Sequence, residues 1–286
     1  MIKETKPRKF NDLLQLMGLS HGTDVWQNNA QDLIRNGTCT LEEVIGCRDD
    51  ILLNLINWGI DSLKAFKIME KVRKGKGLTA DEEALMRENN VPDWYIESCK
   101  KIKYMFPRAH AAAYSISALR IAWFKVYRPE AFYATHFSVK ADEFDYDYAK
   151  MSLGEITALR KKMRHNFNFL TDREQKIFYI IEIIEEMLLR GIKFVPIDIE
   201  TANARLFKVV SKNEIMPALN TVKSISTAMA EKIVAAREDG NGKFENHEEL
   251  QRRSGLGNAA IKALKDNHIL DHIPESAQVS LFDMLG

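Results

Sequence analysis

Apolar side chains recur three and four positions apart along most of the chain, which is the spacing of one face of an α-helix. Thr40 and Glu43 have the sequence pattern of a capping box, so a helix is predicted to begin at Thr40 and to end at Gly59. The same pattern at Thr79 and Glu82 predicts another helix start. Further helices are predicted over residues 28–35, 61–74, 92–103, 108–126 and 171–190.

The pattern changes between residues 194 and 216, where the apolar residues no longer follow the helical period. Residues 206–210 and 214–216 are short runs separated by the turn-forming segment 211–213, which predicts a small β-hairpin. Residues 222–272 then predict two short helix pairs. The expected fold class is therefore mostly α with one small β-hairpin.

Composition excludes several classes of protein. The chain has 286 residues, of which 45% are hydrophobic and 28% charged, as in an ordinary globular protein rather than a disordered or collagen-like chain. No apolar run is long enough for a transmembrane helix, and the first residues lack the apolar core of a secretory signal. Cys39, Cys47 and Cys99 are too few for a disulfide framework or a four-ligand zinc site, which fits a cytoplasmic location. The net charge of +1 favours no class of partner.

Residues 100–128 carry seven Lys or Arg and no Asp or Glu, and aromatic residues are interleaved among them. Such a surface suits phosphates and stacked bases. Arg108 and His110 lie in the first turn of a predicted helix, where the helix dipole and free N–H groups favour an anion such as a triphosphate. Tyr114 lies on the same face as His110. A packed helix with a solvated basic rim explains the same pattern, and the pattern alone leaves both interpretations open.

A possible phosphate-binding turn lies near the C-terminus. Gly255-Leu256-Gly257-Asn258 joins two predicted helices, and such a turn presents consecutive backbone N–H groups to one phosphate. Lys262 adds a positive charge nearby. The segment that begins Lys223-Ser224-Ile225-Ser226 resembles a second copy, with serines at the two glycine positions. An ordinary helical hairpin is the alternative for each copy alone, whereas two in tandem favour binding of a nucleic-acid duplex.

The last residues contain a short Gln-x-x-Leu-Phe pattern formed by Gln278, Leu281 and Phe282. A peptide of this kind can insert two apolar side chains into a pocket of a partner protein. The alternative is a disordered terminus with hydrophobic residues by chance.

Other catalytic patterns are not found. The acidic run of Asp142, Glu143, Asp145 and Asp147 is explained by a solvated loop, and no other carboxylate cluster suits two-metal phosphoryl transfer. The sequence has no Walker-type phosphate loop and no convincing Ser/His/Asp arrangement. His21 could serve a site, but a histidine without partner residues of a catalytic pattern is more often structural.

Residues 104–114, with the sequence Tyr-Met-Phe-Pro-Arg-Ala-His-Ala-Ala-Ala-Tyr, resemble the fingers motif of bacterial C-family replicative DNA polymerases, and the PolC type fits best. Residues 18–26, 47–51 and 66–77, the tandem hairpins and the terminal motif follow in the order of that family. The resemblance covers essentially the whole chain but only the C-terminal part of the family. We therefore expect an engineered fragment or one polypeptide of a split polymerase, and the sequence does not distinguish the two.

The resemblance implies multi-helix fingers followed by a duplex-binding domain with tandem helix-hairpin-helix motifs. The implied domains are fingers over residues 1–140, a duplex-binding domain over 141–272 with its hairpins at about 219–272, and a clamp-binding tail over 273–286. The resemblance assigns the nucleotide and template side of the fingers to Arg48, Arg73, Lys74, Arg108, His110 and Tyr114. It implies that the two hairpins, including Lys223 and Lys262, bind the phosphates of duplex DNA. It also implies that Gln278, Leu281 and Phe282 bind the sliding clamp.

The resemblance also implies partners and a cofactor. The partners are primer–template DNA, the incoming dNTP, the sliding clamp and the upstream palm and thumb, with no membrane. The catalytic Mg²⁺ ions belong to palm aspartates outside this chain, so no metal ligands and no catalytic residues are expected here, and the chain alone is expected to be inactive. Ser224 and Ser226 stand where the family usually has glycines, so the first hairpin is expected to hold DNA less well, because serine resists a positive φ.

Two other functions remain open at this level. One is an autonomous DNA- and clamp-binding module without polymerase activity. The other is a general helix-hairpin-helix repair protein, which gives no reason for the motif at residues 106–114.

Overall fold

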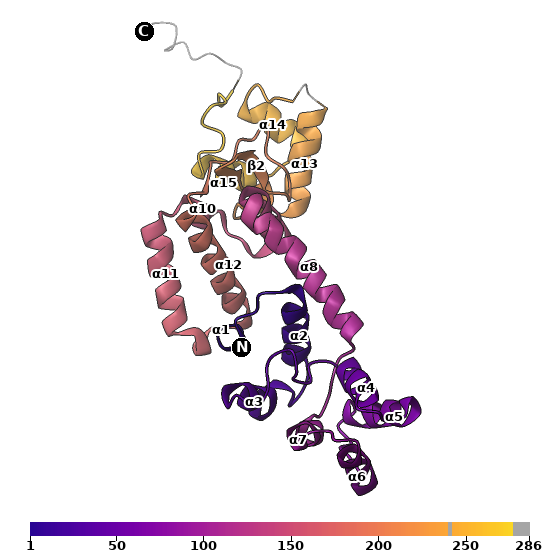
Figure 1. Cartoon of the computed structure of the whole chain (residues 1–286). Helices are drawn as coiled ribbons and strands as arrows, with labels where there is room; N and C mark the ends of the chain where they lie inside the picture. The colour runs from indigo at the N-terminus through magenta and orange to yellow at the C-terminus, as the bar shows by residue number, and fades with distance from the viewer. Residues whose placement is uncertain (240–241, 277–286) are drawn as a thin grey trace, which may run out of the picture. The chain divides into compact units, whose positions relative to one another are not determined.

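A computed structural model describes residues 1–239 and 242–276 of the chain (Figure 1). The chain divides into two compact units, residues 1–122 and 123–286, and each is described by itself. One long helix, α8 (Arg108–Tyr127), runs from the first unit into the second. The fingers boundary expected at residue 140 is not tested by this division and stays a prediction.

The first unit is helical. Its elements are α1 (Ile2–Thr5), α2 (Phe10–His21), η1 (Trp26–Ala30), α3 (Gln31–Arg35), α4 (Arg48–Asn57), α5 (Ser62–Val72), α6 (Ala80–Glu88), α7 (Asp93–Lys101) and the first part of α8. Helix α4 packs along α5, and Ile51, Leu55 and Ile68 from this pair are almost fully buried with Tyr95 of α7. The apolar stripes seen in the sequence therefore form one core beneath these helices.

One predicted helix start is wrong. Thr40 and Glu43 do contact each other, since the Thr40 backbone N–H donates to Glu43 Oε2 at 2.7 Å, but only a turn follows. Helix α4 instead begins at Arg48, because Asp50 accepts the N–H groups of Gly46 and Cys47 and ends the preceding loop there. By contrast, the capping box at Thr79 is confirmed at the start of α6.

The second unit begins with the end of α8 and continues with α9 (Pro129–Val139), η2 (Ala141–Glu143), α10 (Tyr146–Lys150), α11 (Leu153–His165), η3 (Phe167–Phe169) and α12 (Asp172–Leu189). The helix predicted at residues 171–190 is confirmed as α12. The hydrophobic pattern did not indicate α9, because both its buried and its exposed positions are apolar: Tyr133 and Phe137 are buried, whereas Val139 is exposed. Pro129 begins this helix, at the first position, where the backbone N–H of a helix has no partner within the helix.

The predicted β-hairpin is confirmed as β2 (Lys208–Ser211) and β3 (Glu214–Met216), which pair antiparallel with Val209 opposite Ile215. A short strand, β1 (Lys193–Phe194), adds in parallel to β3, so the order is β1-β3-β2 and β2 is an edge strand. This third strand was not predicted from the sequence, since two residues give no alternation.

The chain continues with η4 (Leu219–Thr221), α13 (Thr227–Glu238), α14 (His247–Ser254) and α15 (Asn258–Asp266). The second predicted helix pair is confirmed as α14 and α15. The first is corrected, because the segment before its turn is the single 3₁₀ turn η4 rather than an α-helix. Pro217 directly follows β3, which leaves too few residues for a longer helix before the turn.

Within residues 1–239 and 242–276, none of the helices combines the length and the apolar character needed to cross a lipid bilayer.

Candidate functional site

The extended segment 103–107 joins three parts of the first unit that are far apart in the sequence. Thr23 follows α2, Arg48 begins α4 and Arg73 follows α5. Five backbone hydrogen bonds attach the segment to them: Lys103 N to Thr23 O (3.1 Å), Tyr104 N to Thr23 O (3.4 Å), Thr23 N to Tyr104 O (2.9 Å), Met105 N to Arg73 O (3.2 Å) and Arg48 N to Phe106 O (3.1 Å). The segment therefore holds Arg48, Arg73 and the start of α8 beside one another.

Three of the predicted cationic residues surround one carboxylate, that of Glu70 on α5. Lys74 Nζ lies 2.9 Å from Glu70 Oε2, Arg48 Nη1 lies 3.9 Å from Oε1, and Arg73 donates to both oxygens. These hydrogen bonds hold the pKa of Glu70 at about 2, against an ordinary value of 4.5, with Arg73 the larger cause and Lys74 the next. Glu70 thus stays ionised and positions three positive side chains on a surface that keeps a net positive charge.

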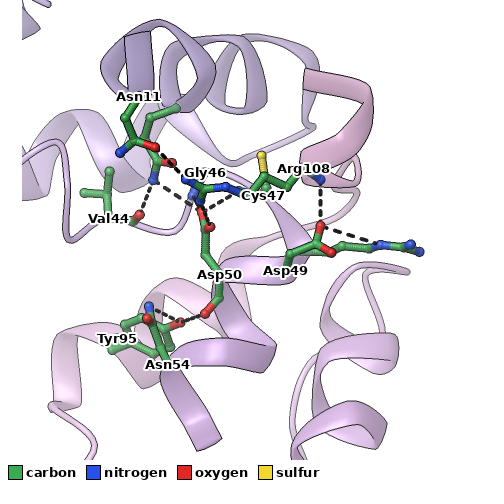
Figure 2. A network of polar contacts seen from close by, with 11 residues as sticks. Asn11, Val44, Gly46, Cys47, Asp49, Asp50, Asn54, Tyr95 and Arg108 are labelled. Atoms are coloured by element: carbon green, nitrogen blue, oxygen red, sulfur yellow. Dashed lines mark hydrogen bonds and ion pairs between the residues drawn. The ribbon is translucent and has the colours of Figure 1, made fainter. Parts of the chain in front are cut away.

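Arg108 takes part in a buried network that Figure 2 shows. Its Nη1 donates to Asp50 Oδ1 at 2.8 Å and its Nη2 to Asn11 Oδ1 at 2.5 Å. The buried Asp50 carboxylate also accepts from Gly46 N, Cys47 N and Gln15 Nε2 at 2.8 to 3.3 Å. Arg108 therefore attaches α8 to α2 and α4, while about a third of its side chain stays exposed.

The first turn of α8 already has an anion of the protein itself. Asp49 Oδ2 accepts the backbone N–H of Arg108 at 2.6 Å (Figure 2). The same oxygen lies 3.9 Å from Nε of the Arg48 side chain. His110 N and Ala111 N both bond to Pro107 O. The free N–H groups that the sequence suggested at this helix start are thus largely occupied by protein acceptors, so the exposed side chains, rather than the helix end, are available to a ligand.

His110 and Tyr114 belong to an aromatic cluster on one face of α8. The rings of His110 and Phe106 are stacked with centroids 4.8 Å apart, and the Tyr114 ring lies 4.6 Å from His110. The ring of His21, at the end of α2, lies beside those of Phe106, His110 and Tyr114, with ring centroids 5.9 to 6.4 Å apart. Half of the Tyr114 side chain is exposed. A stacked cluster with an exposed ring offers a planar face to a base.

The second hairpin has the geometry of a phosphate-binding turn. Gly255 ends α14 with φ 65°, and Gly257 precedes α15 with φ −76°. A Cβ atom added at either glycine would meet no other atom within 4 Å, so the space above the turn is open. Leu256 between them is buried and fixes the turn to the core. Asn258 Oδ1 accepts from Gln251, and the exposed Lys262 pairs with Asp266 at 2.6 Å.

The first hairpin has the same backbone in spite of its serines. Ser224 adopts φ 71°, the left-handed conformation of Gly255, and Ile225 is buried like Leu256. Ser226 begins α13 with φ −72°, and its hydroxyl accepts the N–H of Met229 at 3.3 Å. Lys223 pairs with Asp147 at 2.9 Å and Asp145 at 3.0 Å. The turn is therefore formed, but its lysine is held by two carboxylates.

Sequence reasoning missed Glu70, Asp49 and Asp50, the acceptors that position the cationic residues. Asp50 carries a signal in the sequence, because it stands three residues after Cys47 as the acidic residue of a capping box. Glu70 lies in the segment 66–77, which resembles the polymerase family, but in the sequence it looks like an ordinary surface charge.

The residues predicted to bind the clamp, Gln278, Leu281 and Phe282, lie outside the described residues. In the described part of the chain, no three His, Cys, Asp or Glu side chains lie close enough together to hold a metal ion.

Two family models match separate parts of the chain. Residues 1–91 match the bacterial DNA polymerase III alpha subunit finger domain, and residues 191–278 match a helix-hairpin-helix motif. The first match covers the part of the first unit that contains the Glu70 cluster, and the second covers the part of the second unit that contains the two hairpins.

Longer similarity is found to proteins named DNA polymerase III PolC-type. Those of Caldanaerobacter subterraneus and Listeria monocytogenes are each 47% identical over 282 residues, and that of Bacillus subtilis is 45% identical over 282 residues. Each alignment covers 99% of this chain but only 19–20% of the relative, so the chain spans about a fifth of the length of these relatives. The chain is thus similar, over nearly all of its length, to one segment of these PolC-type DNA polymerase III relatives.

Proposed function

We propose that this chain supplies the fingers and the duplex-binding part of a replicative DNA-directed DNA polymerase of the C family, acting in the bacterial cytoplasm together with an upstream palm and thumb. The observation that carries the proposal is the gathering of Arg48, Arg73 and Lys74 around Glu70, beside the segment that leads into the aromatic cluster of α8. The similarity to PolC-type relatives supports it over the whole chain.

The Glu70 cluster suits the triphosphate of an incoming nucleotide. Three cations share one carboxylate, so a polyphosphate entering the cluster gains charge-assisted hydrogen bonds while Glu70 keeps the side chains in place. Tyr114 and His110 offer a ring face for the template or the new base pair. The role of these residues is positioning and charge stabilisation, which is what phosphoryl transfer requires of groups that do not bind the metal. The Mg²⁺ ions would be held by the palm, outside this chain.

The two hairpins suit the phosphates of the DNA product. Each turn presents backbone N–H groups beside a small residue, and hydrogen bonds from backbone N–H groups to phosphates position a duplex without reading its sequence. The tail with Gln278, Leu281 and Phe282 would bind the sliding clamp, and this contact would raise processivity through effective concentration.

The proposal is tested by nucleotide incorporation on a primed template, with the chain alone, with the upstream polymerase part alone, and with both together. Synthesis only in the combined reaction supports it. In that reaction Arg73→Ala should raise the KM for dNTP at least tenfold, while the exposed control Arg35→Ala should change it less than twofold. Failure of the two parts to complement, together with intact binding of duplex and clamp, would favour the autonomous module instead.

A further inference from the structure

Helices α11 and α12 pack along each other, and residues 160–171 form the α11–α12 tip, where the chain turns from the first helix into the second (Figure 1). The tip contains no Asp or Glu, and its basic residues are Arg160, Lys161, Lys162, Arg164 and His165. The last four of these side chains are exposed. Positive charge is therefore concentrated on the surface at this end of the helix pair.

Most of the tip's positive charge is not neutralised by the protein itself. Arg160 forms an ion pair with Glu185 of α12. Among residues 1–239 and 242–276, no carboxylate oxygen lies within 4.0 Å of a side-chain nitrogen of Lys161, Lys162 or Arg164. The C-terminal end of a helix favours cations, but its dipole amounts to about half a negative charge, which one cation offsets. The remaining charge is available to an external anion.

An exposed aromatic ring stands at the same tip. In η3, Phe167 packs against the buried Phe178 with ring centroids 5.1 Å apart. A 3₁₀ turn rotates by about 120° per residue, so side chains two positions apart point to different sides. Phe169 accordingly faces solvent and is 88% exposed, more than any other large apolar side chain in the described part of the chain. One planar ring is thus free beside the cations.

Internal contacts hold the tip in a defined shape. The Arg164 guanidinium lies over the ring of Phe178, 5.6 Å from its centre. The side-chain amide of Asn166 donates to Lys162 O at 3.3 Å, which closes the last turn of α11. Lys161 and Arg164 are three residues apart on a helix and therefore share a face. A ligand meets these groups already in place and does not have to order the backbone that carries them.

We propose that the α11–α12 tip binds a single strand of nucleic acid, with phosphates on Lys161, Lys162 and Arg164 and one base stacked on Phe169. Cations that follow the backbone together with a ring for stacking are how proteins bind single strands without reading their sequence. A duplex keeps its bases stacked on one another, and an acidic protein segment has no planar base, so neither uses the ring in this way. The inference rests on the proposed function only in taking DNA as the strand, and it uses none of the residues assigned to nucleotide or duplex above.

The first test measures fluorescence anisotropy of a labelled 12-nucleotide oligo-dT, titrated with the full chain. A strand of equal length without bases is titrated in parallel. Phe169→Ala should weaken binding of oligo-dT at least about fivefold, because stacking of one base contributes about 1–3 kcal/mol, and should change binding of the base-free strand less than twofold. Leu189→Ala, at the far end of α12 and 69% exposed, is the control and should change neither. Circular dichroism should be unchanged for both variants.

The second test measures the dependence of binding on salt. Replacing both Lys161 and Lys162 by Ala should weaken binding of both strands. It should also reduce the slope of log K against log salt concentration by about 1.4, since each phosphate contact to a single strand contributes about 0.7. Replacing the exposed Lys64 and Lys67 of α5 by Ala removes the same charge elsewhere and should leave the slope unchanged.

Ultraviolet cross-linking of a strand that contains 5-iodouracil locates the contact, and the adduct is expected on the peptide that contains Phe169. The tip is refuted as a strand-binding site if Phe169→Ala changes oligo-dT affinity less than twofold. It is refuted equally if a poly-glutamate peptide of the same charge displaces oligo-dT as well as a second oligo-dT does, which would indicate an acidic protein partner. Strand binding that depends on Phe169 without nucleotide incorporation would contradict the proposed function alone, and the reverse pattern would contradict the tip alone.

Discussion

Ser224 and Gly255 occupy the same position in two successive turns and share the left-handed conformation, with φ 71° and 65°. The next residues match as well, since Ile225 and Leu256 are both buried. The first hairpin therefore forms the same turn as the second, although Ser224 stands where the second hairpin has a glycine. The conformation costs a residue with a Cβ atom roughly 1–2 kcal/mol, so the buried Ile225 and the cap at Ser226 must hold Ser224 there.

This relationship predicts opposite effects of two exchanges. Ser224→Gly should stabilise the second unit by about 1 kcal/mol, and Gly255→Ser should destabilise it by about the same amount, because only glycine adopts positive φ without steric cost. Thermal unfolding of both variants and the parent chain under matched conditions measures the difference. A lower melting temperature for Ser224→Gly would show that the serine hydroxyl, rather than the backbone conformation, stabilises this turn.

Gly257 offers a way to separate folding from duplex binding. Its φ of −76° suits any residue and an added Cβ meets no protein atom, so Gly257→Ala should change stability by less than about 1 kcal/mol. The methyl group would stand in the open space where a phosphate approaches, and duplex affinity should fall several-fold. Gly154→Ala on α11 is the control, since its Cβ also has room but lies outside the hairpins. Unchanged duplex affinity for Gly257→Ala would remove this turn from the proposed DNA contact.

Asp50 is expected to matter for stability more than for ligand binding. Asp50→Ala leaves Gly46 N, Cys47 N and the Arg108 guanidinium without their common acceptor, and loss of one partner of a buried ion pair costs about 3 kcal/mol or more. Denaturant unfolding followed by tryptophan fluorescence is suitable, because three of the four tryptophans lie in the first unit. Asp81→Ala, at an exposed position of α6, is the control and should cost less than about 0.5 kcal/mol.

Gly75 and Gly77 provide a matched pair of glycines with positive φ, 70° and 67°. A Cβ at Gly75 would lie 2.5 Å from Lys103 O, whereas a Cβ at Gly77 would meet nothing within 4 Å. Both alanine variants should pay the conformational cost of about 1 kcal/mol, and Gly75→Ala should lose a further 1–3 kcal/mol because it pushes the segment 103–107 away. Equal unfolding free energies for the two variants would show that this close approach is unimportant.

The depressed pKa of Glu70 gives the first unit a defined dependence on pH. Because the folded-state pKa of about 2 lies below the ordinary 4.5, the contribution of Glu70 to stability is complete above about pH 5.5 and is lost as the pH falls from 4.5 towards 2. The difference in unfolding midpoint between the parent chain and Glu70→Gln should therefore shrink over that range. Glu88→Gln controls for the removal of one negative charge from the unit, and a difference for Glu70→Gln that stays constant down to pH 2 would contradict the assignment.

Much of the fold could be predicted because it depends on local signals. The capping box at Thr79, the amphipathic run that became α12 and the turn between the strands each act within a few residues. The failure at Thr40 has the same origin, since its contact with Glu43 formed as predicted but Asp50 placed the helix start later. A local pattern cannot show which of two possible caps the core will accept.

The sequence by itself determined which residue types were available: the basic and aromatic run before and within α8, the two hairpin turns and the cationic residues of the fingers motif. Tertiary structure decided how they are arranged. Segment 103–107 brings Arg48 and Arg73 together across 25 residues of sequence, and Glu70 holds them, because their charges repel one another unless a carboxylate lies between them. It also decided that Arg108 binds Asp50, since a buried carboxylate needs a positive partner and the fold placed Arg108 beside it.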